Sequence, residues 1–451
     1  MKKFLNSLER VLSPMAKKIG ENKYLIAIRD GFLLSTPVLI VGSFFLLIAN
    51  FPLNQWDTWM SALLGKEWAS HMMVPASASF DIMTILAVAG IAYSLARQFD
   101  EDAMQAAIIS LVAFFIVTPY TTFFTPENTE TVYEVTSLPL KWMGSSGLFL
   151  GMITALVATR LFVWVVRKGW KIKMPDSVPP TVSKSFEALI PSFVIIFVFF
   201  VIDWLATLTS YGSLQDIIFN LLQMPLLSLG NTLGAMIVAY IFLHFFWFFG
   251  INGSSVVGAV FNPVLRALSM ENLEAYKAHT EIPNIITGQF QDMFATFGGA
   301  GSTLSLVIVM VLFCKSQRIK KLSQLSIVPS FFGINEPIIF GLPIVLNPII
   351  LVPFVLVPTI NIIIAYFAMS WGLVPFTNGI QLPWTTPIVF SGFLVSGWQG
   401  AVLQVLLLFL GMVIYYPFVK MMDRQYLEEE KNYAEELEDD INFEDFDFDA
   451  L

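Results

Sequence analysis

The sequence predicts an all-α membrane protein with about ten transmembrane helices and a re-entrant hairpin. Hydrophobic residues make up 56% of the 451 residues and charged residues only 13%, about half the share that soluble domains carry. Apolar runs of about 20 residues, long enough to cross a bilayer, recur along the chain. Basic residues gather in clusters whose spacing places them on one side of that bilayer.

The apolar runs give the expected spans in chain order. They lie at about 29–50, 79–96, 102–118, 142–166, 188–207, 227–250, 252–269, 290–314, 345–370 and 396–418. The third and seventh runs are short, and we expect each to be a half-crossing or a kinked helix. A further apolar stretch is broken by two glycines and two prolines between 333 and 343. It predicts a re-entrant hairpin near 325–343, because these residues interrupt a helix.

Lysine and arginine set the expected orientation. Basic clusters precede the first span, follow the fourth over 167–184, and follow the eighth over 315–321. The loop over 119–139 holds three glutamates and no basic residue. With ten spans, all three basic clusters fall on one side, so both termini are expected in the cytoplasm.

Four regions follow from this pattern. Residues 1–28 predict an amphipathic surface helix, residues 29–207 an N-terminal half of five spans, and residues 208–420 a C-terminal half that contains the hairpin. Residues 427–451 form an acidic tail with twelve carboxylates and one lysine, which we expect to be solvated and disordered. Without this tail the chain carries about +2 of charge instead of the overall −9.

Composition also excludes some classes of function. No basic cluster is interleaved with aromatic residues on a soluble domain, so nothing supports nucleic-acid binding. We expect no metal ion and no cofactor. The single cysteine, Cys314, cannot form a disulfide within the chain, and we expect a buried structural thiol.

Glu336 is the first candidate site residue. It is the one carboxylate in an apolar stretch, inside Gly-Ile-Asn-Glu-Pro at 333–337. An ionisable group at membrane depth is costly and therefore usually functional. We predict that Glu336 accepts hydrogen bonds from sugar hydroxyls or takes a proton, with Asn335 beside it; the alternative is a structural carboxylate that caps the hairpin.

A second candidate segment is His244-Phe-Phe-Trp-Phe-Phe-Gly-Ile-Asn-Gly-Ser. Trp247 offers a flat apolar face for a pyranose ring, or it belongs to an interfacial aromatic belt. Asn252 and Ser254 supply hydrogen-bonding groups next to two glycines. His244 is either a packed helix histidine or a site residue.

Further candidates come from polar breaks elsewhere. Asn378 and Trp384 lie in a polar, Gly/Pro-broken segment between two spans, where Trp384 predicts a second wall of a sugar site. As for Trp247, the alternative for Trp384 is an interfacial aromatic belt. Gly144 and Ser146 open the fourth span and add possible donors. Arg97 ends the second span as a snorkelling residue or a site residue.

These motifs resemble a known family. Gly-Ile-Asn-Glu-Pro followed by Ile-Ile-Phe-Gly resembles the signature of the membrane C component (EIIC) of sugar phosphotransferase systems. The contexts of Trp247 and Trp384, and the opening segment from Leu8 to Phe32, resemble the lactose/cellobiose/diacetylchitobiose branch. The resemblance covers essentially the whole chain.

The resemblance implies a homodimer in the lipid bilayer of a bacterial inner membrane. Its N-terminal half would make the dimer contact, and its C-terminal half would carry a β-linked disaccharide stacked on tryptophans: cellobiose or diacetylchitobiose, with lactose third. A phosphocysteine on a separate cytoplasmic B subunit, charged by an A subunit, would phosphorylate the 6-hydroxyl. The family's glutamate maps onto Glu336, and the asparagine before it onto Asn335.

One position departs from the family pattern, in which Trp-Phe-Phe-Gly-Ile is followed by histidine. Here Asn252 stands at that position, and an amide cannot take up a proton. Three possibilities remain: Glu336 suffices as the base, His244 replaces the missing histidine, or phosphorylation is weak while sugar binding persists.

The chemistry of phosphoryl transfer predicts a separate partner protein, independently of the family resemblance. The chain holds no Gly-rich phosphate-binding loop and no soluble domain large enough to deliver a phosphoryl group. Two other classes stay open. In a proton-coupled sugar symporter, Glu336 would bind the proton, whereas a sugar-gated receptor would bind sugar without transport.

Overall fold

The computed structural model describes most of the chain. The described residues are 21–51, 55–124, 131–170, 172, 174–175, 183, 186–249, 252–342, 344 and 347–440. The expected surface helix over 1–28 lies outside this set up to residue 20, and the last eleven residues of the acidic tail also lie outside it.

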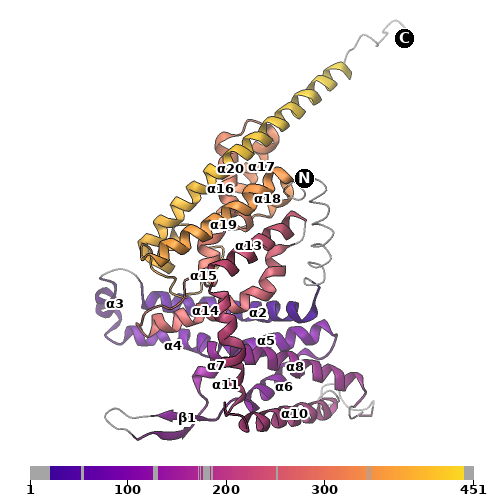
Figure 1. Ribbon diagram of the computed structural model, residues 1–451, viewed down its shortest axis with the longest axis vertical. Helices are drawn as coiled ribbons and strands as arrows, with labels where there is room; N and C mark the ends of the chain where they lie inside the picture. The colour runs from indigo at the N-terminus through magenta and orange to yellow at the C-terminus, as the bar shows by residue number, and fades with distance from the viewer. Residues whose placement is uncertain are drawn as a thin grey trace. The chain divides into compact units, whose positions relative to one another are not determined.

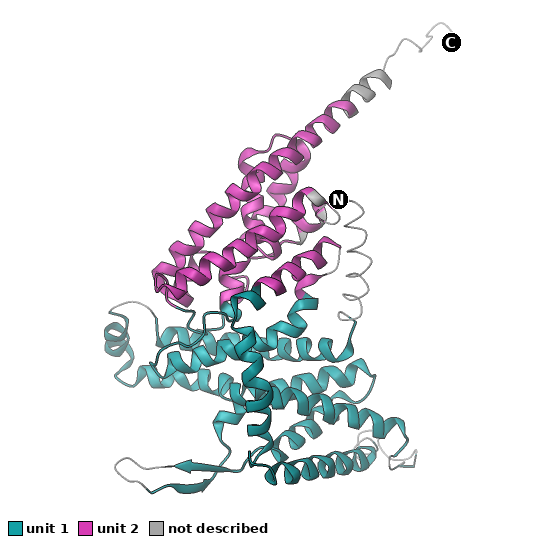
Figure 2. Cartoon of the chain, viewed as in Figure 1, with its two compact units in different colours: residues 1–236, 255–289, 376–382 teal, residues 237–254, 290–375, 383–451 magenta. Residues whose placement is uncertain are grey.

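The chain forms two compact units that are interleaved along the sequence (Figure 2). Unit 1 comprises Met1–Met236, Ser255–Gln289 and Phe376–Leu382. Unit 2 comprises Ile237–Ser254, Phe290–Pro375 and Pro383–Leu451. The segment with Glu336 and the segment with Trp384 therefore belong to the same unit, although 47 residues of chain separate them.

Unit 1 is built around helices that pack closely through glycine. α2 packs against α4 and α5, and α5 packs against α6 and α8. At the crossing of α2 and α5, a Cβ on Gly31 would lie 2.5 Å from the backbone nitrogen of Ile91, and one on Gly90 would lie 2.5 Å from the Gly31 carbonyl oxygen. Only glycine allows this approach. The helices are α2 (Lys23–Ala49), α3 (Trp56–Leu64), α4 (Trp68–Phe80), α5 (Met83–Gln98), α6 (Ala103–Ile116), α7 (Leu140–Met143), α8 (Leu148–Arg167), α10 (Leu189–Thr207), α11 (Leu214–Ile218) and α12 (Met224–Gly230).

A short β-hairpin is the exception to the helical class. β1 (Thr121–Phe124) pairs antiparallel with β2 (Tyr133–Thr136), so that Thr121 faces Thr136 and Phe124 faces Tyr133. β-branched and aromatic residues fill both strands, and such residues favour a pleated surface. The acidic 119–139 loop, for which no strands were predicted from the sequence, thus contains a small sheet (Figure 1).

Unit 2 packs three long helices together, with α20 alongside α16 and α19 (Figure 1). α13 (Leu233–Phe248) and α14 (Gly253–Lys277) each run through both units. The other helices from α15 onward are α15 (Gly288–Phe290), α16 (Thr303–Phe313), α17 (Gln317–Phe331), α18 (Glu336–Gly341), α19 (Pro348–Ser370) and α20 (Phe390–Asp440). Between α15 and α16 lie a π-helical turn, Gln291–Ala295, and a 3-10 turn, Ala300–Ser302.

Seven helices of the described chain are long and apolar enough to cross a membrane. They are Lys23–Ala49, Trp68–Gln98, Ser145–Arg167, Leu189–Thr207, Gly288–Phe313, Ile349–Ser370 and Phe390–Asn432. The pair Leu214–Gly230 and Leu233–Phe248, bent by 75°, adds an eighth if it is one span. The two runs expected to be short, 102–118 and 252–269, correspond to α6 and α14, which are not in this set. The count of ten spans therefore stays a prediction.

The start of the acidic tail is helical rather than disordered. α20 continues to Asp440, well past the expected boundary at Glu428. Two contacts account for the ordered turns near this boundary. The Arg318 guanidinium lies 4.5 Å from the Tyr426 ring centre, and Glu430 accepts hydrogen bonds from the first turn of α17. The charge pattern alone could not show these partners, because they lie more than 100 residues away.

Candidate functional site

Glu336 lies at the start of α18, directly after a tight turn. α17 ends at Phe331, and Gly333 then adopts φ +82°, a left-handed conformation that suits glycine. Ile334 and Gly333 donate backbone hydrogen bonds of 3.0 and 3.1 Å to the last turn of α17. α18 folds back on α17, because a Cβ at Gly341 would lie 2.4 Å from Leu322. The helix break predicted from glycine and proline is therefore present.

Asn335 joins this turn to a second irregular loop. Its side-chain amide donates to the carbonyl oxygen of Ala300 at 3.0 Å, and the residue is only 6% exposed. We call Gly298–Ser302 the glycine loop. Four of its five residues have positive φ, and a Cβ at Gly299 would lie 2.6 Å from Asn335 Cγ. Asn335 thus fixes the backbone next to Glu336, and strained loops of this kind cluster at functional sites.

His244 holds the same loop from another side. Its Nδ1 lies 2.6 Å from the Tyr240 carbonyl oxygen, and its Nε2 accepts the N–H of Gly301 at 2.9 Å. A carbonyl oxygen can only accept, so Nδ1 carries the proton. Tyr415 donates its hydroxyl to the Gly301 carbonyl oxygen at 2.6 Å. His244 is therefore a buried, hydrogen-bonded helix histidine in which both ring nitrogens have protein partners.

Trp384 lies against the turn that leads to Glu336. Its side chain is 60% exposed, and a Cβ at Gly333 would lie 3.0 Å from Trp384 Cε3. A narrow pocket lies beside it, bounded by the aromatic residues Phe331 and Trp384 and by polar side chains. The closed volume of this pocket, about 20 Å³, holds about one water molecule rather than a sugar ring. The surface available for stacking a pyranose ring is therefore the exposed indole face of Trp384.

Sequence reasoning missed Asp292 and Thr296, which are two of the polar residues that line this pocket. Asp292 lies on the π-helical turn Gln291–Ala295, and Thr296 follows it. The signal for Asp292 was available, because it is a charged residue inside the apolar run 290–314. The same reasoning that identified Glu336 applies to it.

Trp247 is oriented by a neighbour in the sequence. Its indole N–H donates to Ser254 Oγ at 3.2 Å, and the residue is 9% exposed. Glycine is required at Gly253, the first residue of α14, since a Cβ on it would lie 1.8 Å from the Leu243 carbonyl oxygen. Asn252 is exposed at this junction. Of the two glycines at this break, Gly253 begins α14 and Gly250 lies outside the described residues.

The remaining four candidates belong to unit 1, whereas Glu336, Trp247 and Trp384 belong to unit 2. Arg97 is exposed, 6.0 Å from the Tyr93 ring centre. The other three lie in or near turns. The Gly144 carbonyl oxygen accepts from Thr84 Oγ1 at 2.5 Å, Ser146 lies in a 3-10 turn, and Asn378 Oδ1 accepts the N–H of Ile380 at 3.0 Å.

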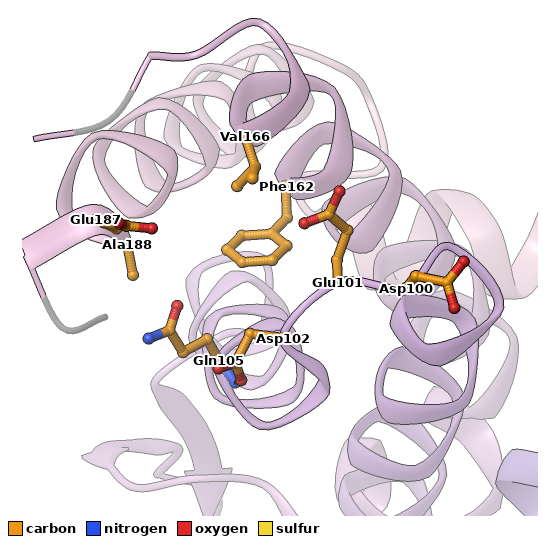
Figure 3. A pocket seen from close by; sticks show the side chains of 8 residues that line it. All are labelled: Asp100, Glu101, Asp102, Gln105, Phe162, Val166, Glu187 and Ala188. Atoms are coloured by element: carbon orange, nitrogen blue, oxygen red, sulfur yellow. The ribbon is translucent and has the colours of Figure 1, made fainter. Parts of the chain in front are cut away.

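Unit 1 also contains an acidic pocket of about 370 Å³ (Figure 3). Carboxylates of Asp100, Glu101, Asp102 and Glu187 line it around the ring of Phe162. Glu101 pairs with an arginine of α8 at 3.2 Å, and Asp102 caps α6 by accepting an N–H at 3.1 Å. Glu101 and Asp102 thus have structural partners, which favours a structural role for them over sugar binding.

Comparison with known proteins decides the family. The model of the family "Phosphotransferase system, EIIC" matches residues 29–358. The chain belongs to this family. The resemblance predicted from the Glu336 motif is therefore confirmed. Glu336, Trp247, Asn252 and the whole glycine loop lie within the matched residues, whereas Trp384 lies beyond them.

Two EIIC relatives cover nearly the whole chain. The cellobiose-specific EIIC component of Geobacillus stearothermophilus is 42% identical over 436 residues, which are 96% of this chain and 97% of the relative. The crystal structure of the transporter ChbC, the IIC component of an N,N'-diacetylchitobiose-specific phosphotransferase system, has a TM-score of 0.92 and 43% identity. The match covers 94% of this chain and 99% of that chain.

A third relative carries a second component in its name. The lactose-specific EIICB component of Staphylococcus aureus (strain COL) is 32% identical over 452 aligned positions. The alignment covers 97% of this chain and 75% of the relative. The EIIC family thus includes chains longer than this one.

Proposed function

We propose that this chain is a sugar permease that imports a β-linked disaccharide and presents its 6-hydroxyl to a separate, phosphorylated B subunit. The observation that carries the proposal is the position of Glu336. It begins a helix directly after Asn335, which the glycine loop holds, and three residues after Gly333, on which Trp384 packs. The backbone of Glu336 and the exposed indole of Trp384 therefore lie at one turn, while the Glu336 side chain lies outside the described part of the structure.

Each site residue has a role in this proposal. Trp384 provides one wall for a sugar ring, and Trp247, oriented by Ser254, provides another. Asp292 and Thr296 offer hydrogen-bond partners in the pocket beside Trp384. Glu336 accepts the hydroxyl proton as the phosphoryl group arrives, which is the general-base step of phosphoryl transfer. His244 and Asn335 position this site through the glycine loop.

Asn252 bears on how the proton is handled. An amide can donate and accept hydrogen bonds but cannot take up a proton. His244 is buried with both ring nitrogens bonded, which disfavours it as a replacement base. We therefore assign the proton to Glu336 alone and a sugar-binding role to Asn252.

The substrate class rests on the relatives. Two of the similar proteins with near-complete coverage are named for cellobiose and for N,N'-diacetylchitobiose, and the more distant EIICB relative is named for lactose. We propose cellobiose or diacetylchitobiose as the substrate, ahead of lactose. The name EIICB supports a B component as the phosphoryl donor, supplied here by a separate chain that an A subunit recharges.

The membrane arrangement belongs to the proposal as well. We propose a homodimer with about ten spans, a re-entrant hairpin at Glu336 and both termini in the cytoplasm of a bacterial cell. The apolar helices of the described chain support a multi-pass protein. The proposed halves are 29–207 for dimer contact and 208–420 for sugar transport.

Uptake into proteoliposomes tests the proposal against a proton symporter. Labelled cellobiose and diacetylchitobiose are offered with either an imposed proton gradient or a phosphorylated B subunit inside the vesicles. We expect uptake to require the phosphorylated B subunit and to be independent of the proton gradient. Accumulation driven by the gradient alone would identify a symporter, and binding without uptake would identify a receptor.

A further inference from the structure

A buried carboxylate of α20 binds the chain just before α17. Asp423 is 1% exposed, and its Oδ1 accepts the backbone N–H groups of Lys315 and Ser316, each at 2.9 Å. Lys420 lies 3.1 Å from the other carboxylate oxygen. Burying a carboxylate is unfavourable unless hydrogen bonds and a counter-charge compensate. The two backbone amides and the Lys420 ammonium therefore compensate for the burial of the Asp423 carboxylate.

A second carboxylate continues this contact. Glu430 lies seven residues, about two helical turns, further along α20. It accepts the N–H groups of Gln317 at 3.2 Å and Arg318 at 3.1 Å, and the Ser316 hydroxyl donates to it at 2.7 Å. Two carboxylates on one face of α20 therefore bind consecutive amides of one helix start.

Together these bonds account for the unpaired amides of α17. The first N–H groups of a helix have no partner within it. Here Asp423 takes that of Ser316, Glu430 takes the next two, and Ser316 Oγ lies 3.5 Å from the N–H of Ile319. The carboxylates also complement the positive end of the helix dipole. α17 is thus capped largely by another helix.

Neighbouring side chains on the same face of α20 extend the contact. The Tyr416 and Phe313 rings are 5.1 Å apart, and Lys420 donates to the Phe313 carbonyl oxygen at 2.8 Å. Tyr426 lies under the Arg318 guanidinium. Spacings of three and four residues place these side chains on one stripe of the helix.

The other end of α17 leads to the turn between Phe331 and Glu336, which we call the Glu336 turn. α17 has 15 residues and is about 22 Å long at 1.5 Å per residue. Beyond it, Gly333 packs against Trp384, and Asn335 binds the glycine loop. α17 thus connects the Asp423 and Glu430 contacts at its start to the turn that precedes Glu336 at its end.

We propose that Asp423 and Glu430 are positioning residues that hold Glu336 in place through α17. This inference rests on the proposed function for its catalytic consequence. The capping contact itself can be measured independently of any activity.

Amide hydrogen exchange on the full-length protein tests the contact. Asp423→Ala and Glu430→Ala are compared with wild type and with Glu428→Ala, an exposed carboxylate on the same helix. We expect the amides of 315–318 to exchange at least tenfold faster in the first two variants and unchanged in the control. Asp423→Asn, which keeps one acceptor oxygen, should be intermediate. Unchanged exchange in both alanine variants would overturn the proposal.

Kinetics of sugar phosphorylation test the positioning role. We expect kcat to fall at least fivefold in Asp423→Ala and Glu430→Ala, with the dissociation constant for sugar within twofold of wild type. Retained sugar binding shows that the variants are folded. Faster exchange with an unchanged kcat would overturn the positioning role and leave the proposed function intact. A wild-type protein that forms no sugar phosphate would refute the proposed function and the catalytic part of this inference together.

Discussion

At the scale of single residues, Glu336 carries the proposed chemistry. We expect Glu336→Gln to abolish sugar phosphorylation, because an amide cannot accept the hydroxyl proton, while sugar binding stays detectable. Turnover with a phosphorylated B subunit measures the first effect, and a binding titration measures the second. Glu281→Gln, in an exposed loop, is the matched control. Full turnover in Glu336→Gln would remove Glu336 as the base.

Trp384 tests the aromatic wall. Trp384→Ala should weaken sugar binding by about 1–3 kcal/mol, the effect of losing a stacked aromatic contact. Trp398→Ala provides the control, since Trp398 is similarly exposed, at 66% against 60%. Equilibrium titration with labelled disaccharide measures both variants. Equal affinities in the two variants would assign Trp384 to the interfacial belt.

The reactivity of the Cys314 thiol is expected to depend on pH. Burial, aided by the nearby Asp423 carboxylate, raises the pKa of the Cys314 thiol to about 12. The reactive thiolate therefore forms only as pH rises toward that value. At pH 7.5 we expect maleimide to label the folded protein at least about 100-fold more slowly than the denatured chain, whose thiol pKa is about 8.5. Comparable labelling rates would show that the thiol is neither buried nor shifted.

How far single residues could be predicted depended on where their partners lie. The Glu336 turn was predictable, because its glycine and prolines are adjacent in the chain and a lone carboxylate in an apolar stretch stands out. The bond between His244 and Gly301 was not, since 57 residues separate them. Periodicity reports which face of a helix a residue occupies, but not which distant backbone group meets it.

At the scale of elements, the glycine loop contains a position that only glycine fits. Gly301 has φ +80°, and a Cβ there would lie 2.1 Å from Phe354 Cδ2. We expect Gly301→Ala to destabilise the protein by about 2–4 kcal/mol, from backbone strain and overpacking together. Thermal unfolding in detergent measures this loss as a lower apparent Tm.

A second glycine supplies the control for that experiment. A Cβ on Gly234, in α13, would meet no atom within 4 Å, so Gly234→Ala should leave stability unchanged or raise it slightly. Equal stabilities of the two variants would mean that the glycine loop tolerates a side chain. The structural role assigned to the loop would then be wrong.

Elements were predicted best where local signals sufficed. Long apolar helices followed from composition, and the break between α17 and α18 followed from glycine and proline. The β-hairpin was missed, because its strands have only four residues each, too few for a periodic signal. The helical start of the tail was missed, because a run of like charges predicts disorder unless distant partners such as those of Glu430 are known.

At the scale of the whole molecule, the family was predictable and the division into units was not. The Glu336 motif identified the EIIC family, which the family match confirms. The two units exchange segments along the chain, so that 376–382 belongs to unit 1 although its neighbours on both sides belong to unit 2. Hydropathy finds spans one at a time and carries no information about which spans pack together.

We propose that this chain presents a disaccharide for phosphorylation by a separate subunit. The most direct test supplies a B subunit carrying a radioactive phosphoryl group to the purified, reconstituted protein with unlabelled cellobiose or diacetylchitobiose. We expect label to move onto the 6-position of the sugar, only when this chain is present and not with Glu336→Gln. Label that stays on the B subunit while the chain still binds the sugar would contradict the account.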